Sequence, residues 1–297
     1  MKIFIDGAYG TTGMQLQSRL AQIQDLEYIT LRDEYKDMSA RANALNSCDV
    51  AFLCLPDQAA IEAVSLIKND NVIVIDSSTA HRTNPDWAYG FPELSEKFAN
   101  KIKTSNRIAV PGCHASGFNA ICYPLFCHSG ARSEPGIPFN ENIVCYSLTG
   151  YSGGGNAMIE EFEKLGDKAF GAYPYALQLK HKHLAEMISV CGLSRPPIFQ
   201  PIITPVKQGM LVSVPLFEDC EKIYDILYSH YKNAENIDVT VPDNGDVLFM
   251  TEQNNTNKMR LIVYGNDNQT IVTAQLDNLG KGASGAALQC FKLRCGL

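Results

Sequence analysis

Cys113 has the clearest potential for chemistry in this sequence, because it directly follows Pro111 and Gly112 in the run VPGCHASGFN. Proline and glycine interrupt regular structure, so a helix can begin at the cysteine. The dipole at a helix N-terminus favours the thiolate, which is the nucleophilic form of the side chain. A buried core thiol is the competing interpretation, since free cysteine is among the most buried residue types.

Proton transfer is the second chemistry that the residues offer. The run LKHKHLAEM contains His181, His183 and Glu186. In a helix, His183 and Glu186 would share one face because they are three residues apart, whereas His181 would point in another direction. A histidine pair beside a glutamate is suited to general acid–base work on a reacting thiol. The spacing is not the H-E-x-x-H of zinc enzymes, so we predict no metal site.

A glycine-rich loop, GAYGTTG at residues 7–13, has the spacing G-x-x-G-x-x-G. It follows a strand that ends at Asp6 and precedes a helix that starts near Thr11, the place where backbone N–H groups hold a pyrophosphate. The spacing departs from the strict G-x-G-x-x-G fingerprint and also fits a simple tight turn. The surrounding βαβ pattern favours dinucleotide binding. The expected cofactor contacts are Gly7, Tyr9, Gly10, Thr11, Thr12 and Gly13.

The end of the second strand, LRDEY at residues 31–35, bears on the choice of cofactor. An NAD site usually carries an acidic residue there, which binds the ribose hydroxyls. Here Arg32 comes first and can pair with a 2′-phosphate, although the charge of Asp33 opposes this. The pattern favours NADP(H) over NAD, with Arg32 as a cofactor contact.

Two further runs are candidates for binding anionic groups. DSSTAHR, at residues 76–82, follows a strand at its carboxyl end, where ligands of α/β proteins bind, and Arg82 could clamp an anion there. A lone arginine is more often an ordinary surface residue. TGYSGGG, at residues 149–155, joins a strand to a helix through three glycines, which suits anion binding by backbone N–H groups. A plain loop is the alternative for this run.

The elements that would position these residues change character along the chain. In the first 112 residues, strands at 2–6, 28–31, 49–56 and 72–76 alternate with helices at 14–26, 40–45 and 59–67. This alternation predicts βαβ units and a parallel sheet. Beyond it, longer strands predict an α+β domain with a mostly antiparallel sheet and a hairpin around 266–269. Those strands lie at 141–151, 202–206, 209–217, 260–266 and 270–278, with helices at about 155–165, 180–191, 220–233 and 283–293, and a surface loop at 133–140.

Composition excludes several classes of protein. The chain has 297 residues, 45% of them hydrophobic and 19% charged, with a net charge of −7 and no basic cluster. Nucleic acid is therefore not an expected partner. The longest apolar run, residues 50–55, is too short to cross a membrane, so we expect no membrane association. The ten cysteines include no C-x-x-C pair, which indicates reduced thiols in a cytoplasmic protein.

Several motifs together resemble one known family. In chain order they are IDGAYGTTG, DSSTAHR, YGFPEL, VPGCHASGF, GYSGGG, HKHLAEM, QGMLVSVPL and LDNLGKGASGAALQ. With them the chain resembles the shorter, second type of N-acetyl-γ-glutamyl-phosphate reductase of arginine biosynthesis, over nearly its whole length. That family is similar in fold to aspartate-semialdehyde dehydrogenase and glyceraldehyde-3-phosphate dehydrogenase.

The resemblance implies an α/β fold of the semialdehyde-dehydrogenase type. A Rossmann-like, parallel-sheet NADP-binding domain would comprise residues 1–112 and 282–297, with the closing helix packed back on it. An α+β domain with a mostly antiparallel sheet, residues 113–281, would carry the catalytic site and the dimerisation surface. A homo-oligomer, either a dimer or a tetramer, is the expected assembly, with a small-molecule substrate.

The resemblance also implies roles for individual residues. Cys113 would attack an acyl phosphate, and NADPH would reduce the resulting thioester to a semialdehyde. His183 is preferred over His181 as the acid or base, and the Cys113 amide would bind the oxyanion. The expected substrate contacts are Arg82, Ser152, Gly153 and Glu186, and the expected nicotinamide contact is Asn278, in the run NLGKG.

The chain departs from the family pattern beside the cysteine. The usual PGCYPT reads PGCHAS, so that His114, Ala115 and Ser116 replace tyrosine, proline and threonine, and Ala185 replaces a proline of HKHLPEM. These changes bear on substrate positioning more than on the chemistry. Two alternatives stay open: another acyl-phosphate reductase such as aspartate-semialdehyde dehydrogenase, and a non-catalytic NADP-binding regulator.

Overall fold

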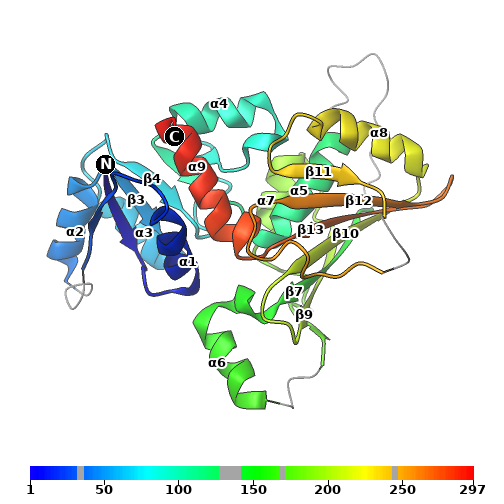
Figure 1. Ribbon diagram of the computed structural model, residues 1–297, viewed down its shortest axis with the longest axis horizontal. Coiled ribbons are helices and arrows are strands. Elements are labelled where there is room, and N and C mark those ends of the chain that lie inside the picture. The colour runs from blue at the N-terminus through cyan, green and yellow to red at the C-terminus, as the bar shows by residue number, and fades with distance from the viewer. Residues whose placement is uncertain (32–36, 127–141, 167–170, 243–246) are drawn as a thin grey trace. The chain divides into compact units, whose positions relative to one another are not determined.

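The chain divides into two compact units in a computed structural model that describes residues 1–31, 37–126, 142–166, 171–242 and 247–297 (Figure 1). The first unit comprises Met1–Pro111 and Ala283–Leu297. The second unit comprises Gly112–Gly282. Each unit is built around its own sheet, and the two sheets follow different rules of pairing.

The first unit contains a six-stranded sheet in the order β2-β1-β3-β4-β6-β5, and every pair of neighbours is parallel. This confirms the predicted parallel sheet. The last two strands were not predicted, because runs of two and three residues carry too little pattern. The strands are β1 (Lys2–Asp6), β2 (Glu27–Ile29), β3 (Val50–Leu53), β4 (Ile73–Asp76), β5 (Ala88–Tyr89) and β6 (Arg107–Ala109).

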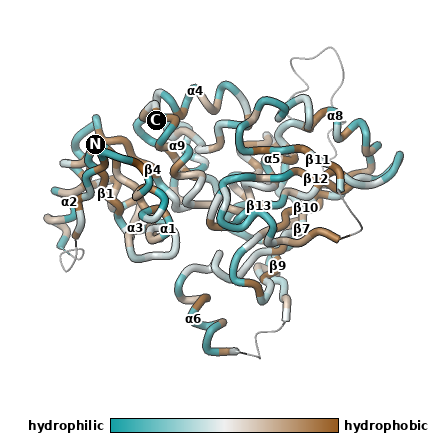
Figure 2. Tube along the Cα trace, viewed as in Figure 1, coloured by the Kyte–Doolittle hydropathy of each residue, from teal (hydrophilic) through white to brown (hydrophobic). Residues whose placement is uncertain are grey.

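Helices cover both faces of this sheet. One face packs against α1 (Thr11–Leu20), α4 (Glu96–Thr104) and α9 (Gly285–Cys295), in a core that includes Leu16, Ile102 and Phe291. The other face packs against α2 (Met38–Ser47) and α3 (Asp57–Leu66). The residues VAFL of β3 are buried at every position. A strand buried on both faces has no polar side, which explains why this strand is apolar throughout (Figure 2).

The second unit contains a seven-stranded sheet in the order β11-β12-β13-β10-β7-β9-β8. Four neighbouring pairs are antiparallel, while β11–β12 and β7–β9 are parallel, so the sheet is mixed with mostly antiparallel pairing. The predicted hairpin around 266–269 is confirmed by the β12–β13 pair, in which Gly265 lies opposite Thr270. The strands are β7 (Val144–Gly150), β8 (Tyr173–Pro174), β9 (Ile198–Thr204), β10 (Met210–Leu216), β11 (Ile237–Thr240), β12 (Met259–Gly265) and β13 (Thr270–Leu276).

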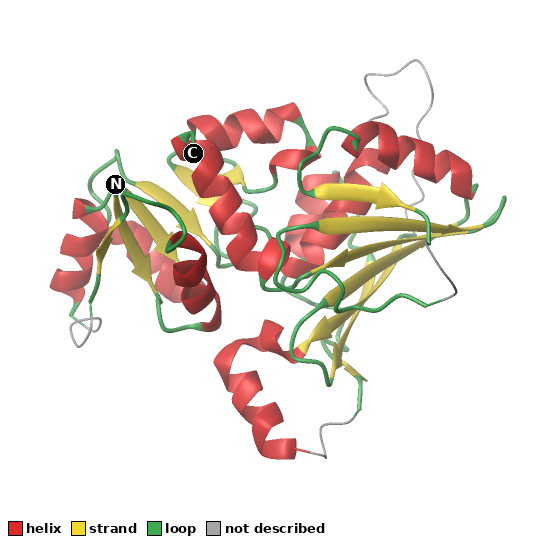
Figure 3. Ribbon diagram, viewed as in Figure 1, coloured by secondary structure: helices red, strands yellow, loops and turns green. Residues whose placement is uncertain are grey.

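Three helices lie on one face of the second sheet: α5 (Cys113–Phe126), α7 (Leu184–Cys191) and α8 (Cys220–Tyr231) (Figures 1 and 3). Helix α5 approaches the strands closely, because a Cβ atom on Gly117 would lie 2.6 Å from the Cβ of Val212. Only glycine permits this approach. The helix that begins at Cys113 is therefore fixed on the sheet below it.

Helices α6 and α7 test two predicted boundaries. Helix α6 (Gly155–Leu165) has the predicted limits and follows a 3-10 turn at Tyr151–Gly154. Helix α7 begins at Leu184 rather than near residue 180. The reason is local, since Leu179 has a φ of +55° and the chain turns before the helix can start.

Candidate active site

Cys113 is the first residue of helix α5. The carbonyl of Gly112 accepts the N–H of Ser116 at 2.8 Å and its hydroxyl at 3.1 Å, which fixes the first turn. The N–H groups of a first turn have no carbonyl partner within their own helix, and they favour negative charge at that end. The backbone of Gly282 passes close by, because a Cβ there would lie 2.8 Å from the Cβ of Cys113. The thiol is partly exposed.

Glu186 holds the backbone just ahead of the cysteine. Its side chain is buried at 2% exposure, and its Oε2 atom accepts the N–H of Gly112 at 3.1 Å. Glu186 belongs to the first turn of α7. This bond joins the start of α7 to the Pro-Gly turn and so to the start of α5.

Three histidine rings gather around His114, the residue that follows the cysteine. His114 follows the cysteine in α5, and His183 immediately precedes α7. The ring centre of His183 lies 5.5 Å from that of His114 and 4.7 Å from that of His181. The structure thus brings both predicted histidines to the residue next to Cys113 in the chain. We predicted from helical spacing that His181 and His183 point in different directions. That argument does not apply, because His181 precedes the helix.

Hydrogen bonds join these rings to residues that the sequence reasoning missed. Nδ1 of His114 lies 2.8 Å from Oγ of Ser147, and Nε2 lies 2.9 Å from the Tyr175 hydroxyl. That hydroxyl lies 3.3 Å from Nε2 of His181. Burial, and then the charge of Cys113, raise the pKa of Tyr175 above its usual value, so its phenol stays neutral. Tyr175 follows the two-residue strand β8, too short for a pattern to single it out.

The glycine-rich turn at 149–155 is tied down from within the second unit. Oγ of Ser152 accepts the side-chain amide of Asn278 at 3.0 Å, and Oδ1 of Asn278 accepts the N–H of Gly209 at 2.9 Å. A Cβ on Gly153 would lie 3.5 Å from Oγ1 of Thr149, an ordinary contact distance. Packing within the unit therefore does not require glycine at 153. The roles of these residues toward ligands stay predictions.

In the first unit, the glycines of GAYGTTG serve different purposes. Gly7 has a φ of +85°, and a Cβ there would lie 2.3 Å from the carbonyl oxygen of Cys54. A Cβ on Gly13 would lie 2.3 Å from the carbonyl oxygen of Gly7, so α1 packs directly on the turn. At Gly10, which caps α1, the nearest atom would be 3.4 Å away. The fold requires glycine at 7 and 13, but not at 10.

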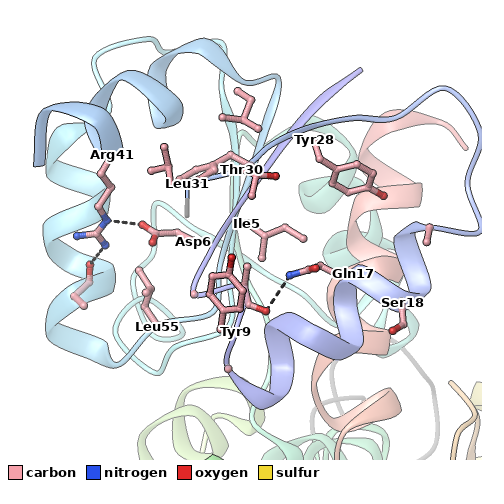
Figure 4. Close-up of a pocket in the computed structure, with 17 residues that line it drawn as sticks. Ile5, Asp6, Tyr9, Gln17, Ser18, Tyr28, Thr30, Leu31, Arg41 and Leu55 are labelled. Carbon is pink, nitrogen blue, oxygen red and sulfur yellow. Dashed lines mark hydrogen bonds and ion pairs between the residues drawn. The ribbon is translucent and has the colours of Figure 1, made fainter. Parts of the chain in front are cut away.

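A cavity of about 890 Å³ adjoins this loop at the carboxyl ends of β1 and β2 (Figure 4). Tyr9, with 63% of its surface exposed, lies on its wall, and Thr11 and Thr12 open α1. On another wall, Arg41 bonds Asp6 at 2.6 Å. Burial raises the pKa of Asp6 in spite of this pair. Arg32, the predicted phosphate contact, lies outside the described residues.

The DSSTAHR run forms a turn that is stabilised by its own side chains. Asp76 is fully buried and accepts the N–H of Ser78 at 2.9 Å, and its other oxygen lies 2.7 Å from Nδ1 of His81. Arg82 donates through Nε to the carbonyl of Val110 at 2.8 Å and through Nη2 to Ser77 at 3.0 Å. Arg82 is thereby fixed to the strand end that leads to Cys113 in the chain.

The described residues contain no cluster of three or more histidine, cysteine, aspartate or glutamate side chains that could hold a metal ion. Nor does any described helix have the length and apolar character needed to cross a membrane.

Two family models match the chain. One, described as semialdehyde dehydrogenase, NAD binding domain, matches residues 2–103, and the other, described as semialdehyde dehydrogenase, dimerisation domain, matches residues 113–278. The chain is 42% identical over 307 residues to the N-acetyl-gamma-glutamyl-phosphate reductase of Chelativorans sp. (strain BNC1), covering 98% of this chain and 97% of that protein. The chain belongs to the N-acetyl-gamma-glutamyl-phosphate reductase family. The resemblance seen in the motifs is confirmed.

Other comparisons agree. The N-acetyl-gamma-glutamyl-phosphate reductase 2 of Nostoc sp. (strain PCC 7120) is 40% identical, over 100% of this chain and 97% of that protein. Family membership makes this chain an oxidoreductase, and its first unit a nicotinamide-dinucleotide-binding domain.

Solved structures confirm the predicted fold class. Aspartate semialdehyde dehydrogenase II of Vibrio cholerae, complexed with ASA, matches with a TM-score of 0.74 at 17% identity, covering 99% of this chain and 98% of that chain. The Candida albicans enzyme, solved with NADP, matches with a TM-score of 0.66 at 15% identity, covering 98% and 97%. At such identities the likeness shows the fold: a Rossmann-like domain joined to a semialdehyde-dehydrogenase-type α+β domain.

Proposed function

We propose that this chain reduces N-acetyl-L-glutamyl 5-phosphate to N-acetyl-L-glutamate 5-semialdehyde and phosphate with NADPH, in arginine biosynthesis. The observation that carries the proposal is the position of Cys113 at the N-terminus of α5, next in the chain to His114, whose ring lies near those of His181 and His183. The 42% identity to a reductase of that name supports the same substrate. A thiol as nucleophile and imidazoles as proton carriers are the set that acyl transfer from a phosphate requires.

The Cys113 thiolate attacks the carbonyl carbon of the acyl phosphate, and the C–O bond to phosphate breaks. The proton that leaves the thiol is carried by a histidine and departs on the phosphate, so the atoms balance. His183 is our preferred carrier, with His181 as the alternative. A thioester remains on Cys113. NADPH, when bound, supplies the hydride that reduces it, and the thiohemiacetal then collapses to the aldehyde and the free thiolate.

The backbone of α5 stabilises charge during these steps. Each tetrahedral intermediate carries an oxyanion, and N–H donors fixed in advance are the most effective way to stabilise it. The Cys113 amide, in the first turn of α5, is the donor that we assign. Glu186 acts through Gly112, whose N–H it holds, and so shapes the substrate pocket.

Arg82, Ser152 and Gly153 are the remaining substrate contacts that we assign. Arg82 carries the fixed positive charge for the substrate's anionic groups, and two backbone carbonyls orient its guanidinium. Ser152 and Gly153 belong to the turn that Asn278 anchors. The N–H groups of this turn are suited to phosphate oxygens.

The first unit fits a dinucleotide on its own geometry. The fold has room for a Cβ atom at position 10. We therefore assign the glycine there to the close approach of a ligand. The expected cofactor contacts remain Gly7, Tyr9, Gly10, Thr11, Thr12 and Gly13, with Asn278 toward the nicotinamide. We assign the preference for NADP(H) to Arg32, whose guanidinium can bind a 2′-phosphate through two parallel hydrogen bonds.

We also propose a homo-oligomer built on the second sheet. Val212 faces α5, so the neighbours of Val212 along β10 face away from it. That opposite face carries half-buried apolar side chains beside polar ones such as Gln200 and Gln275, and no described helix lies on it. A second copy of the chain is the occupant we assign, in keeping with the dimerisation-domain model. The face includes Tyr146, Leu148, Ile202, Leu211, Tyr264 and Ile271.

We place the enzyme in the cytoplasm. The cysteines of the described residues are free thiols, five of them buried. Thiols stay reduced in that compartment. The domain limits that we propose are 1–112 with 282–297 for NADP binding, and 113–281 for catalysis and dimerisation.

The reverse reaction tests the function. Purified protein is given N-acetylglutamate 5-semialdehyde, NADP and phosphate or arsenate, and NADPH formation is followed by absorbance. We expect formation that depends on phosphate or arsenate, with aspartate semialdehyde a far poorer substrate. Preference for aspartate semialdehyde would identify the alternative reductase. Tight NADP binding without turnover of either aldehyde would indicate the non-catalytic regulator.

A further inference from the structure

The hydrogen bonds among the three histidines allow their hydrogens to be placed. A backbone N–H can only donate, and that of His183 lies 3.1 Å from Nδ1 of His181. Nδ1 of His181 is therefore the acceptor, and the neutral ring carries its hydrogen on Nε2. That Nε2–H points at the hydroxyl oxygen of Tyr175, 3.3 Å away.

The same reasoning continues into α5. The Tyr175 hydroxyl accepts from His181, so its own hydrogen is directed to Nε2 of His114, 2.9 Å away. The hydrogen of His114 then lies on Nδ1 and is donated to Ser147, 2.8 Å away. This order requires a neutral His114. Burial, with lesser contributions from the charges of His181 and Lys182, lowers the pKa of His114 to about 3, which satisfies the requirement.

The segment between Tyr175 and His181 is held in an unfavourable conformation. Ala176 and Leu179 have φ angles of +50° and +55°, which side chains other than glycine, asparagine and aspartate rarely adopt. Such strain persists only where the surroundings enforce it, and it is common at functional sites. The contact between Tyr175 and His181 spans this turn and joins its two ends.

We propose that His114 and Tyr175 are positioning residues for His181: the series Ser147–His114–Tyr175 fixes the direction of its ring by accepting the Nε2–H, while the N–H of His183 keeps the hydrogen on Nε2. His181 then keeps one ring orientation at every turnover, and the contact runs through Tyr175 to His114, the residue next to Cys113 in the chain. A ring that is oriented in advance needs no reorganisation when charge develops. The catalytic consequence rests on the proposed reduction, whereas the placement of the hydrogens does not.

Nuclear magnetic resonance tests the placement without any substrate. The chain has six histidines, few enough to resolve when all are labelled with ¹⁵N and correlated with their ring hydrogens. Variants His114→Gln and His181→Gln assign the two rings. We expect His114 to carry its hydrogen on Nδ1 and His181 on Nε2, and we expect Tyr175→Phe to shift the Nε2–H resonance of His181, which loses its acceptor. A hydrogen on Nε2 of His114 or on Nδ1 of His181, or an unchanged His181 resonance in Tyr175→Phe, would overturn the proposal.

Kinetics of the reverse reaction test the consequence. A misplaced catalytic group typically costs about 100-fold, so Tyr175→Phe should lower kcat by about 10- to 100-fold, while KM and the Kd for NADP change by no more than about threefold. His114→Gln retains an acceptor for the Tyr175 hydroxyl and should keep a higher kcat than His114→Phe. The matched control is Tyr231→Phe, which removes another buried hydroxyl of the second unit, bonded to the carbonyl of Ala120 at 2.9 Å.

The control should retain the wild-type kcat. Wild-type activity in Tyr175→Phe, or an equal loss in Tyr231→Phe, would contradict the positioning role. An inactive wild-type enzyme would count against the proposed function alone, because the placement of the hydrogens is read independently. If His114→Phe fails to fold, as judged by thermal unfolding, Tyr175→Phe still decides the question.

Discussion

The glycine loop of the first unit lies within seven consecutive residues and meets the distant backbone of Cys54, whereas the cysteine–histidine cluster of the second unit is itself assembled from distant segments. Gly7 and Gly13 meet within one turn and the start of α1. Ser147 and His114, by contrast, are 33 residues apart, and Tyr175 lies 61 residues from His114. A site of the first kind is set mainly by local backbone geometry, and a site of the second kind depends on the packing of the whole unit.

Among substitutions in either unit, removal of the nucleophile should cause the largest loss of turnover. Cys113→Ala removes the group that forms the thioester, so turnover should disappear, because the covalent route has no substitute. NADPH binding should be unchanged, since the cofactor loop lies in the first unit. The measurement is kcat in the reverse assay together with the Kd for NADPH. Turnover near the wild-type rate would refute the covalent role.

Loss of the proton carrier should come next. General acid–base catalysis typically contributes about 100- to 10,000-fold, so His183→Ala should lower kcat by that order with little change in the Kd for NADPH. The same substitution at His181 is the comparison. A larger loss at His181 would transfer the acid–base role to that residue, and no loss at either would mean that the proton comes from another group.

Arg32 tests cofactor choice in the first unit. A charge-assisted hydrogen bond contributes roughly 1.5–3 kcal/mol, so Arg32→Ala should weaken NADPH binding by about 10- to 150-fold. NADH, which lacks the 2′-phosphate, should lose little. The measurement is kcat/KM with each cofactor in the wild type and the variant. Equal losses for both cofactors would show that Arg32 does not recognise the phosphate.

Two glycines of one loop separate cofactor binding from folding. Gly10→Ala should keep the thermal stability of the wild type. It should weaken cofactor binding, raising the Kd by about tenfold if one ordinary contact is lost. Gly13→Ala should destabilise the unit instead, because its Cβ would meet the Gly7 carbonyl at 2.3 Å. Melting curves and cofactor titrations distinguish the two. Unchanged cofactor binding in Gly10→Ala would show that no ligand approaches that backbone.

His114 should make the second unit sensitive to acid. Its pKa is about 3 in the folded chain, against 6.5 for an ordinary histidine, so only the unfolded chain binds this proton between those values. Stability is therefore complete above pH 6.5 and falls as the pH drops toward 3. Between pH 7 and 5, the wild type should lose about 2 kcal/mol of unfolding free energy more than His114→Gln. Parallel denaturant titrations measure this difference, and equal losses would contradict it.

The contrast between the units also explains what the sequence could predict. The strand–glycine–helix pattern at residues 2–13, the hairpin at 266–269 and the cysteine behind a Pro-Gly break are local signals, and the structure contains the corresponding elements. Tyr175 and Ser147 carry no local signal, because their importance comes from one contact each with His114. The start of α7 was placed too early, since the residue pattern does not reveal a turn at positive φ.

The Cys113 thioester is the central claim, and intact-protein mass spectrometry tests it most directly. The wild-type protein is mixed with N-acetyl-L-glutamyl 5-phosphate in the absence of NADPH, and mass and released phosphate are followed together. We predict that the chain gains one N-acetylglutamyl group on Cys113 and releases one phosphate, and that NADPH then removes the adduct. Cys113→Ala should remain unmodified. Steady turnover by a wild-type chain that never carries the acyl group would contradict the account.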